Sequence, residues 1–375
     1  MHAFKSFSLS SIVACLLVVP LAACSNATGK EEESKPRGSH AGTTAKGAER
    51  NFAPRGDRLL SIALNDTPSQ KFDKAIEKAE AVGIQVVTLP LPWEEIEKEP
   101  GKYKNDLLKI ADSFYSKKGL QLAIELNPID TNNIRMPNDL KSKDFNDPVV
   151  IERYKKALEW TLKQLPSVRL FSLSIGNEVD GVLGQDKAGW EQYSQFYEDT
   201  SNFARKIDPG LKVGCKIMAK GLLKNASNYS KQLNRSSDVV MVTHYPLTEQ
   251  FRVEHPDTVD RTMQDMVHLY PEKPVYFMEL GYPSGKPTGS SEGKQAEFIR
   301  AAFKSWDKEK DHIKFICFVW LYDRPDREIK AYRKYYKMNS ANFESFLGSL
   351  GLCDARGREK PSFKALKEES KNRGW

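Results

Sequence analysis

Residues 170–180 read LFSLSIGNEVD, an apolar strand that ends in a polar pair. Apolar residues occupy every second position from Phe171 to Ile175, which predicts a β-strand. The strand stops at Asn177 and Glu178, an amide beside a carboxylate. The position of this pair in a larger repeat explains why an apolar strand ends in these two residues.

Short apolar runs alternate with amphipathic helical stretches eight times from residue 58 onward. The strand candidates are 59–64, 84–91, 120–126, 170–175, 211–217, 238–244, 274–280 and 313–321. The expected helices are 70–83, 105–119, 149–165, 189–208 and 293–307, with a last helix split between 342–350 and 361–369. Strands that are apolar almost throughout and alternate with helices predict a parallel sheet covered by helices. Eight units over residues 58–375 favour an α/β fold of the (β/α)8 TIM-barrel type over an open doubly wound sheet. The first strand is not followed by a G-x-G-x-x-G turn, which argues against a nucleotide-binding sheet.

The N-terminus predicts export. Lys5 precedes the apolar run FSLSSIVACLLVVP, which is too short to span a bilayer. The following LAAC, residues 21–24, completes a signal peptide over residues 1–23. This segment also resembles the lipobox of bacterial lipoproteins, which implies lipidation of Cys24 and membrane anchoring in the cell envelope, at the outer membrane or cell surface of a Gram-negative cell. An ordinary cleaved signal is the alternative. Residues 24–57 are polar and lack apolar periodicity, so we expect a flexible linker.

Composition fits a soluble globular domain. Of the 375 residues, 39% are hydrophobic and 29% are charged. The net charge of +7 comes from scattered Lys and Arg, which predicts a solvated surface; affinity for an acidic polymer is the alternative. No cluster of aromatic and basic residues indicates nucleic acid. Cys215, Cys317 and Cys353 form an odd set without metal-type spacing, so we expect no disulfide, metal or cofactor, and Cys215 and Cys317 as small buried residues. We expect a monomer.

Polar and aromatic residues collect where the predicted strands end, which is where TIM barrels carry their chemistry. They include Asn65, Trp93, Glu94, Glu125, Asn127, Asn177, Glu178, His244, Tyr245, Glu279 and Trp320. Glu178 ends strand four and Glu279 ends strand seven, so the two can face each other across the mouth. Two facing carboxyl groups with separated pKa values suit glycosidic bond cleavage.

Strand alternation makes a further prediction about which side chains face inward. If Glu178 faces inward, so do Ser172 and Ser174, while Phe171, Leu173 and Ile175 face the helices. The same rule places Phe277 on the inward face with Glu279, and Phe318 with Trp320.

Three motifs resemble the signatures of clan A glycoside hydrolases. They are GNEVD after strand four, FMELGYPS after strand seven, and the closing LGLCDARGREKPSFKAL at 350–366. The resemblance covers the whole barrel and implies a retaining β-glycosidase. It implies that Glu178 is the general acid/base and that Glu279 is the nucleophile of a covalent glycosyl-enzyme intermediate. The two carboxyl groups would then lie about 5 to 5.5 Å apart.

The resemblance also implies how a carbohydrate substrate is bound. Asn177 would hydrogen-bond the sugar 2-hydroxyl, and Tyr245, with His244, would orient Glu279. Trp320 would be the platform under the cleaved sugar. Trp93 and Asn127 would be further contacts. For His244 a purely structural role is the alternative, and Glu125 is expected to face a helix or to serve the structure.

The motifs IGNEVDGVLG and ELGYPSG are most similar to the endo-β-1,4-galactanase branch. However, no arginine ends strand two and no histidine ends strand three, where some relatives have them. Two other classes stay open: a glycan-binding surface lipoprotein that does not cleave, and a two-lobed solute-binding lipoprotein. Residues 322–341, rich in Tyr and basic residues, predict either a solvated helix or a subsite for a polar or acidic glycan. The sequence leaves the sugar, the linkage, and endo or exo cleavage open.

Overall fold

The computed structural model describes residues 52–375. The predicted signal peptide, the predicted lipidation site Cys24 and most of the predicted linker lie outside the described residues. Within residues 52–375, none of the helices combines the length and the hydrophobicity that crossing a bilayer requires.

Parallel strands form a closed barrel, which confirms the predicted fold. In chain order the eight barrel strands are β1 (Leu59–Ile62), β2 (Val86–Pro92), β5 (Gln121–Asp130), β7 (Leu170–Asn177), β8 with β9 (Lys212–Gly214 and Lys216–Met218, two halves of one strand), β10 (Val240–His244), β11 (Val275–Leu280) and β12 (Ile313–Phe318). Hydrogen bonding joins them as β1-β12-β11-β10-β9 and as β2-β5-β7-β8. Between β1 and β2, the Gln85 amide donates to the Leu60 carbonyl at 3.0 Å. Because all these ladders are parallel, every strand ends at the same rim.

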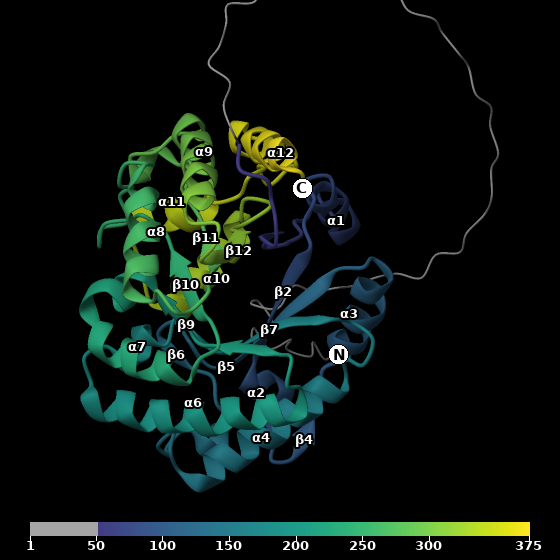
Figure 1. Ribbon diagram of the computed structural model, residues 1–375, viewed down its shortest axis with the longest axis vertical. Coiled ribbons are helices and arrows are strands. Elements are labelled where there is room, and N and C mark those ends of the chain that lie inside the picture. Colours follow the sequence, from purple (N-terminus) through teal and green to yellow (C-terminus); the bar gives the residue numbers. More distant parts are fainter. Residues whose placement is uncertain (1–51) are drawn as a thin grey trace, which may run out of the picture.

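Helices surround the strands (Figure 1). The outer helices are α1 (Phe72–Glu80), α3 (Asp106–Lys117), α4 (Pro148–Lys163), α6 (Lys187–Ile207), α7 (Ser227–Leu233), α8 (Thr258–Leu269), α9 (Glu292–Lys308) and α12 (Pro361–Arg373). The sequence pattern predicted all of these except α7 and α8. α8 buries only three side chains, Val259, Met263 and Met266, so its apolar stripe is narrow.

Shorter elements occupy the loops that follow the strands. They are α2 (Trp93–Ile96), β3 (Glu97–Glu99), β4 (Lys102–Tyr103), β6 (Asn133–Ile134), α5 (Asp180–Leu183), α10 (Asp326–Tyr336) and α11 (Ala341–Gly348). α11 was expected. α10 is a helix, as one interpretation of residues 322–341 required, but its Ile329 and Tyr332 are buried, so it is not simply a solvated helix.

The core has an outer layer between strands and helices and a small inner cluster in the barrel. The inner cluster contains Val86, Ala123, Val239, Met241, Tyr276, Met278, Phe315 and Cys317. Cys215 and Cys317 are buried free thiols, as predicted. Phe171 joins the inner cluster, with its ring centroid 4.9 Å from that of Tyr276, so the prediction that it faces a helix is wrong. The pairing of β7 with β5 skips Phe171, and such a bulge breaks the alternation.

Alternation also fails near the ends of β11 and β12. Phe277 belongs to the outer layer, and the ladder to β10 passes directly from Phe277 to Glu279. This bulge leaves Met278 and Glu279 both facing the barrel mouth. Phe318 packs against Phe303 of α9, with ring centroids 5.8 Å apart. The predicted inward positions of Phe277 and Phe318 are therefore wrong.

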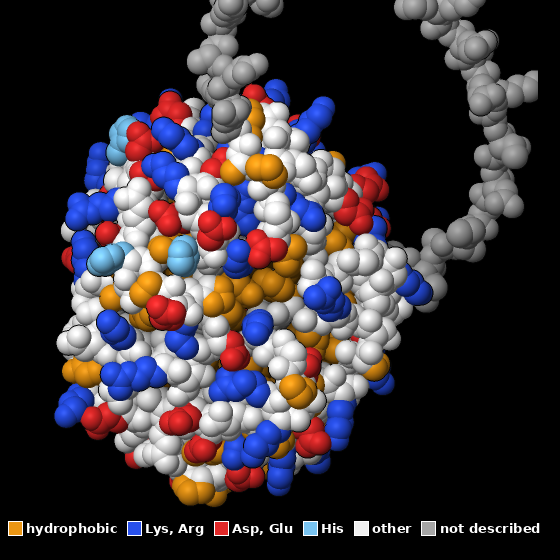
Figure 2. All heavy atoms as spheres, in the orientation of Figure 1, with side chains coloured by type: hydrophobic (Ala, Val, Ile, Leu, Met, Phe, Trp, Pro, Cys, Tyr) orange, Lys and Arg blue, Asp and Glu red, His pale blue; other side chains and the backbone are white. Residues whose placement is uncertain are grey.

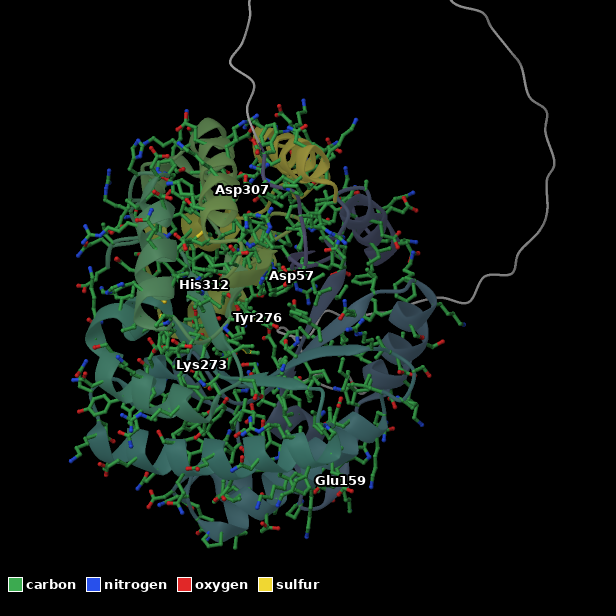
Figure 3. All side chains as sticks on the ribbon, viewed as in Figure 1. Asp57, Glu159, Lys273, Tyr276, Asp307 and His312 are labelled. Carbon is green, nitrogen blue, oxygen red and sulfur yellow. The ribbon has the colours of Figure 1, made fainter. Side chains whose placement is uncertain are left out.

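The opposite end of the barrel, where the strands begin, carries charged residues around an apolar centre. Figure 3 labels Asp57, Lys273 and His312, which precede β1, β11 and β12, and Figure 2 shows apolar side chains near the centre of the drawn face. The chain is already anchored here before residue 58. The Arg55 amide donates to the Arg373 carbonyl at 2.8 Å, and Asp57 pairs with Lys314 at 2.9 Å. Residues 52–57, predicted as the end of the linker, therefore contact the barrel.

Candidate active site

A tight turn at the end of β7 directs Glu178 into the barrel mouth. Gly176 has a φ of +95° and Glu178 a φ of +46°, both in the left-handed region. A Cβ at Gly176 would lie 2.4 Å from the Tyr193 hydroxyl and 2.5 Å from Val179. Only glycine fits this position, so the Gly-Asn-Glu sequence encodes the turn itself.

Glu178 is half-buried and is held by neutral donors. Thr131 donates its hydroxyl to Oε2 at 2.8 Å, and Thr243 donates to Oε1 at 2.7 Å. Burial and, secondarily, the negative charge of Glu279 together raise the pKa of Glu178 to about 7, although the two hydroxyl hydrogen bonds lower it. Near neutral pH this carboxyl group can therefore exist in both the protonated and the ionised form.

Glu279 lies in a cationic environment instead. Lys216 donates to Oε1 at 2.6 Å, and the Tyr245 hydroxyl donates to Oε2 at 2.6 Å. Gly281 makes room for Tyr245, because a Cβ there would lie 2.7 Å from its ring. The expected contact between Tyr245 and Glu279 is thus present, and both donors stabilise the carboxylate form.

Lys216 links Glu279 to a second buried acid. Its side chain is 1% exposed, and its ammonium group also contacts Glu125 Oε2 at 2.9 Å. Burial lowers the pKa of Lys216, but the charges of Glu125 and Glu279 raise it by more, so the lysine stays charged. Burial raises the pKa of Glu125. Glu125 therefore faces the barrel interior, so it does not face a helix, which was one of the two expectations for it; the other, a structural role, agrees with its buried ion pair.

Sequence reasoning missed Lys216, although a signal was present. A lysine interrupts the apolar strand segment VGCKIM, at a position where a charge is unfavourable unless it has a partner. The carboxylate of Glu125, in the apolar strand LQLAIEL, is the matching irregularity. The threonines Thr131 and Thr243 gave no comparable signal.

Asn177 lies next to Glu178 in a polar network. Its Nδ2 donates to Asp130 Oδ1 at 2.7 Å, and the Tyr335 hydroxyl donates to Asp130 Oδ2 at 2.5 Å. The Oδ1 atoms of Asn177 and Asn127 are buried without a hydrogen-bond partner among residues 52–375. Both residues line the cavity, so these oxygens are available to a ligand.

His244 lines the same cavity but does not orient Glu279 through any hydrogen bond formed in the described part of the chain. Its Nε2 is buried without a partner there, and burial lowers its pKa to about 4. A neutral imidazole at this position can contact a ligand. The orienting role that we expected for His244 with Tyr245 falls to Lys216 instead.

A cavity of about 800 Å³ joins these groups at the strand ends. The polar lining near the two glutamates includes Glu125, Asn127, Asp130, Thr131, Asn177, Glu178, Thr243, His244, Tyr245 and Glu279, and the aromatic lining includes Trp320, Tyr332, Tyr336, Phe251, Phe343 and Phe346. Trp320 stacks on Tyr332 with centroids 6.1 Å apart, and the Arg324 guanidinium lies 4.2 Å from its centroid. A half-buried indole at the edge of a polar cavity suits the apolar face of a sugar.

Trp93 does not line this cavity. It is fully buried, its Nε1 donates to Glu97 at 2.9 Å, and its ring packs edge-on against Tyr154. The expected substrate contact of Trp93 is therefore wrong, because α2 begins directly at Trp93 and turns the indole into the core.

No protein-family model matches the chain, and no curated protein sequence is significantly similar to it. Solved structures share its fold. An exo-beta-1,4-mannosidase, Op5Man5, from Opitutaceae bacterium strain TAV5 is 18% identical with a TM-score of 0.66, and the match covers 88% of this chain and 62% of that one. A GH5_18 protein from Streptomyces cattleya in complex with Manb1-4GlcNAc is 15% identical with a TM-score of 0.67, covering 84% and 80%. Xylanase 10B from Thermotoga petrophila RKU-1 is 16% identical with a TM-score of 0.62, covering 87% and 99%.

At these identities the likeness establishes the TIM-barrel fold and no individual residue role. The chain spans less than two thirds of the length of the mannosidase.

Proposed function

We propose that this protein is a retaining β-glycoside hydrolase with Glu178 as the general acid/base and Glu279 as the nucleophile. The observation that carries the proposal is the opposite surroundings of two carboxyl groups in one cavity. Glu178 has neutral donors and a pKa of about 7, whereas Glu279 is paired with a buried cation. One group can hold a proton while the other stays ionised, which is the combination that glycoside hydrolysis needs.

The reaction takes two steps. In the first, a Glu279 oxygen attacks the anomeric carbon while Glu178 gives its proton to the glycosidic oxygen, so the leaving sugar departs as an alcohol. In the second, Glu178, now ionised, takes a proton from water, and the resulting hydroxide displaces Glu279. The anomeric configuration is inverted twice and therefore retained. The expected carboxyl separation is about 5 to 5.5 Å.

Other cavity residues support this chemistry. Trp320 offers a platform for the attacked sugar, and Asn177 is held by Asp130 beside Glu178, where it can reach a 2-hydroxyl. The neighbours described above include a mannosidase, a xylanase and a complex with a β-1,4-linked disaccharide, which favours β-linked glycans as the substrate class. The resemblance of the two motifs to galactanases adds β-1,4-galactan to the candidates.

A glycan-binding protein that does not cleave is the rival. Such a protein would use the aromatic rings and asparagines but would gain nothing from a buried lysine paired with Glu279. The experiment is a panel of β-linked gluco-, manno-, xylo- and galacto-oligosaccharides with product analysis. Cleavage with retained configuration, and labelling of Glu279 by the matching 2-deoxy-2-fluoro glycoside, are the expected results. Measurable binding without cleavage of any member would overturn the proposal in favour of the rival.

The lipobox-like segment supports a second, separate proposal: lipidation at Cys24 anchors the enzyme in the cell envelope. Metabolic labelling with palmitate should mark the wild-type chain in membrane fractions. A Cys24→Ser chain should lose the label and become soluble; equal labelling of both chains would refute the site.

A further inference from the structure

α10 crosses the barrel mouth. It follows β12, but its C-terminal end is held by the loop after β5. Asn132 donates to the Tyr336 carbonyl at 3.0 Å, and the Tyr335 hydroxyl donates to Asp130 at 2.5 Å. In the circular strand order β1 and β2 lie between β12 and β5. α10 is therefore a strap over the ends of β1 and β2, and we use this name for Asp326–Tyr336.

Side-chain contacts close the rim beneath the strap. Asn65, after β1, accepts from the Tyr322 amide at 2.9 Å and donates to the Tyr322 carbonyl at 3.0 Å, which joins the loops after β1 and β12. Arg135, in the loop after β5, pairs with Glu94 at 2.6 Å and with Glu95 at 2.7 Å, which joins the loops after β2 and β5.

The end of the strap is attached to the same arginine. Arg135 donates to the Tyr335 hydroxyl at 2.8 Å, and its guanidinium carbon lies 5.5 Å from the Tyr335 ring centroid. Arg135 is only 5% exposed, so these are buried polar contacts and costly to break. The strap and these contacts therefore close the cavity on this side.

The opposite side lies between the loops after β9 and β10. The β10 loop packs on α11, with the ring centroids of Phe251 and Phe343 5.1 Å apart, but among residues 52–375 no buried side-chain hydrogen bond joins it to the β9 loop. Lys220, Lys224, Glu249 and Gln250 line the cavity there. The Lys220–Glu249 pair that spans these loops is 2.9 Å long, but its side chains are 48% and 76% exposed. An exposed pair of this kind contributes little stability. The cavity thus has one closed end and one open end.

The positions of Glu178 and Glu279 indicate which part of the substrate lies at the closed end of the cavity. Trp320, at the end of β12 next to β11 with Glu279, stacks on Tyr332 of the strap. The sugar attacked by Glu279 therefore lies on the strap side. The leaving oxygen points to Glu178, after β7, and the rest of the substrate extends toward the open side.

Building on the proposed function, we infer that the enzyme is exo-acting: it accepts a β-linked chain by its non-reducing end and releases one sugar per turnover. A chain cannot continue past the attacked sugar, because the strap and the contacts of Arg135 and Asn65 occupy its path. Asn127 and Asn177 both line the cavity, and their buried Oδ1 atoms, which have no hydrogen-bond partner within residues 52–375, are placed to receive hydroxyl groups of the terminal sugar.

The test uses the β-1,4-linked hexasaccharides of glucose, mannose, xylose and galactose, each labelled at the reducing end. Stepwise shortening by one unit, with monosaccharide as the first product, is expected. The same chain with its terminal sugar blocked by a benzylidene acetal should resist cleavage; for xylose, which lacks the 6-hydroxyl, a 4-O-methyl cap serves instead. Early release of di- and trisaccharides, or cleavage of the blocked chain, would overturn the exo mode and leave the hydrolase function standing. Failure to cut any chain would overturn both.

Releasing the strap tests its role. A Tyr335→Ala, Asn132→Ala variant should produce a several-fold larger fraction of oligosaccharide products and should begin to cut the blocked chain. Lys330→Ala, an exposed change on the same helix, is the matched control and should keep the wild-type product pattern. Unchanged products from a folded double variant would show that the strap does not set the cleavage mode.

Discussion

The ends of β7 and β11 carry the same functional group in opposite environments. Glu178 after β7 receives hydrogen bonds from two hydroxyl groups, and burial raises its pKa to about 7. Glu279 in β11 receives a hydrogen bond from a buried ammonium group and another from a tyrosine. A hydroxyl donor is not left with an unpaired charge when its carboxylate partner is protonated, whereas a buried ammonium group is, at a large cost in free energy.

The contrast shows how one barrel can assign two roles to two glutamates. Neither role follows from the residue type, and both strand ends look alike as isolated motifs. The donors come from other strands: Thr243 from β10, and Lys216 from β9. Each change below removes one side of this contrast, beginning with the largest expected effect.

Glu279→Ala should reduce hydrolysis by about 10⁴-fold or more, because the covalent intermediate cannot form. Azide can then take the place of the missing carboxylate and should yield a glycosyl azide of inverted configuration. Product NMR distinguishes this from a Glu178→Ala enzyme, whose azide product should retain the configuration. Glu159→Ala, on α4 and labelled in Figure 3, serves as the control and should keep full activity. Full activity of Glu279→Ala would remove the nucleophile assignment.

Glu178→Gln should lower kcat by about 10² to 10⁴-fold on natural glycosides, since proton donation is lost. In the wild type, activity should fall as pH rises through about 7, because Glu178 must be protonated and loses its proton over this range. The variant should lack this alkaline limb. Nitrophenyl glycosides, whose leaving group needs no proton, should show a much smaller defect in the bond-cleaving step. An unchanged alkaline limb would assign the acid to another residue.

Lys216→Met should lower kcat by about 10²-fold, because the carboxylate of Glu279 loses its cationic partner. The change also leaves Glu125 buried without a partner and should reduce the free energy of unfolding by about 3 to 5 kcal/mol.

Urea unfolding separates the two effects of this lysine. A Lys216→Met, Glu125→Gln double variant should recover much of the stability but not the lost kcat. Recovery of both would mean that Lys216 has only a structural role.

Thr243→Val should have the smallest effect. Loss of one hydrogen bond to the ionised Glu178, worth about 1 kcal/mol, should raise its pKa and move the alkaline limb upward by about 0.7 pH unit. Thr161→Val, which removes a hydroxyl bonded within α4, is the control and should leave the profile unchanged. A downward shift for Thr243→Val would contradict the proposed donor role.

Periodicity predicted the eight strands and most helices, because burial on both faces leaves a continuous apolar run that is visible in one chain. It also predicted that Glu178, Glu279, Asn177, Asn127, His244, Tyr245 and Trp320 lie at one rim, where the structure places all of them on one cavity. It misplaced Phe171 and Phe277, since a bulge adds a residue without any mark in the apolar pattern. It misplaced Phe318 because β12 ends there, so strand alternation does not extend to Trp320.

Local sequence alone thus determined the barrel, the turn that presents Glu178, and the two glutamates at its mouth. Gly176 sets the turn through its own backbone conformation, and the alternating residues set the strands through their near neighbours in sequence. The tertiary structure decided which carboxyl group has a cation and which has hydroxyls, that Trp93 is buried, and that α10 crosses the mouth. These features depend on pairs such as Lys216 with Glu279, 63 residues apart, and Tyr335 with Asp130, 205 apart. Contacts at such separations are set by barrel closure, which no short stretch of the chain encodes.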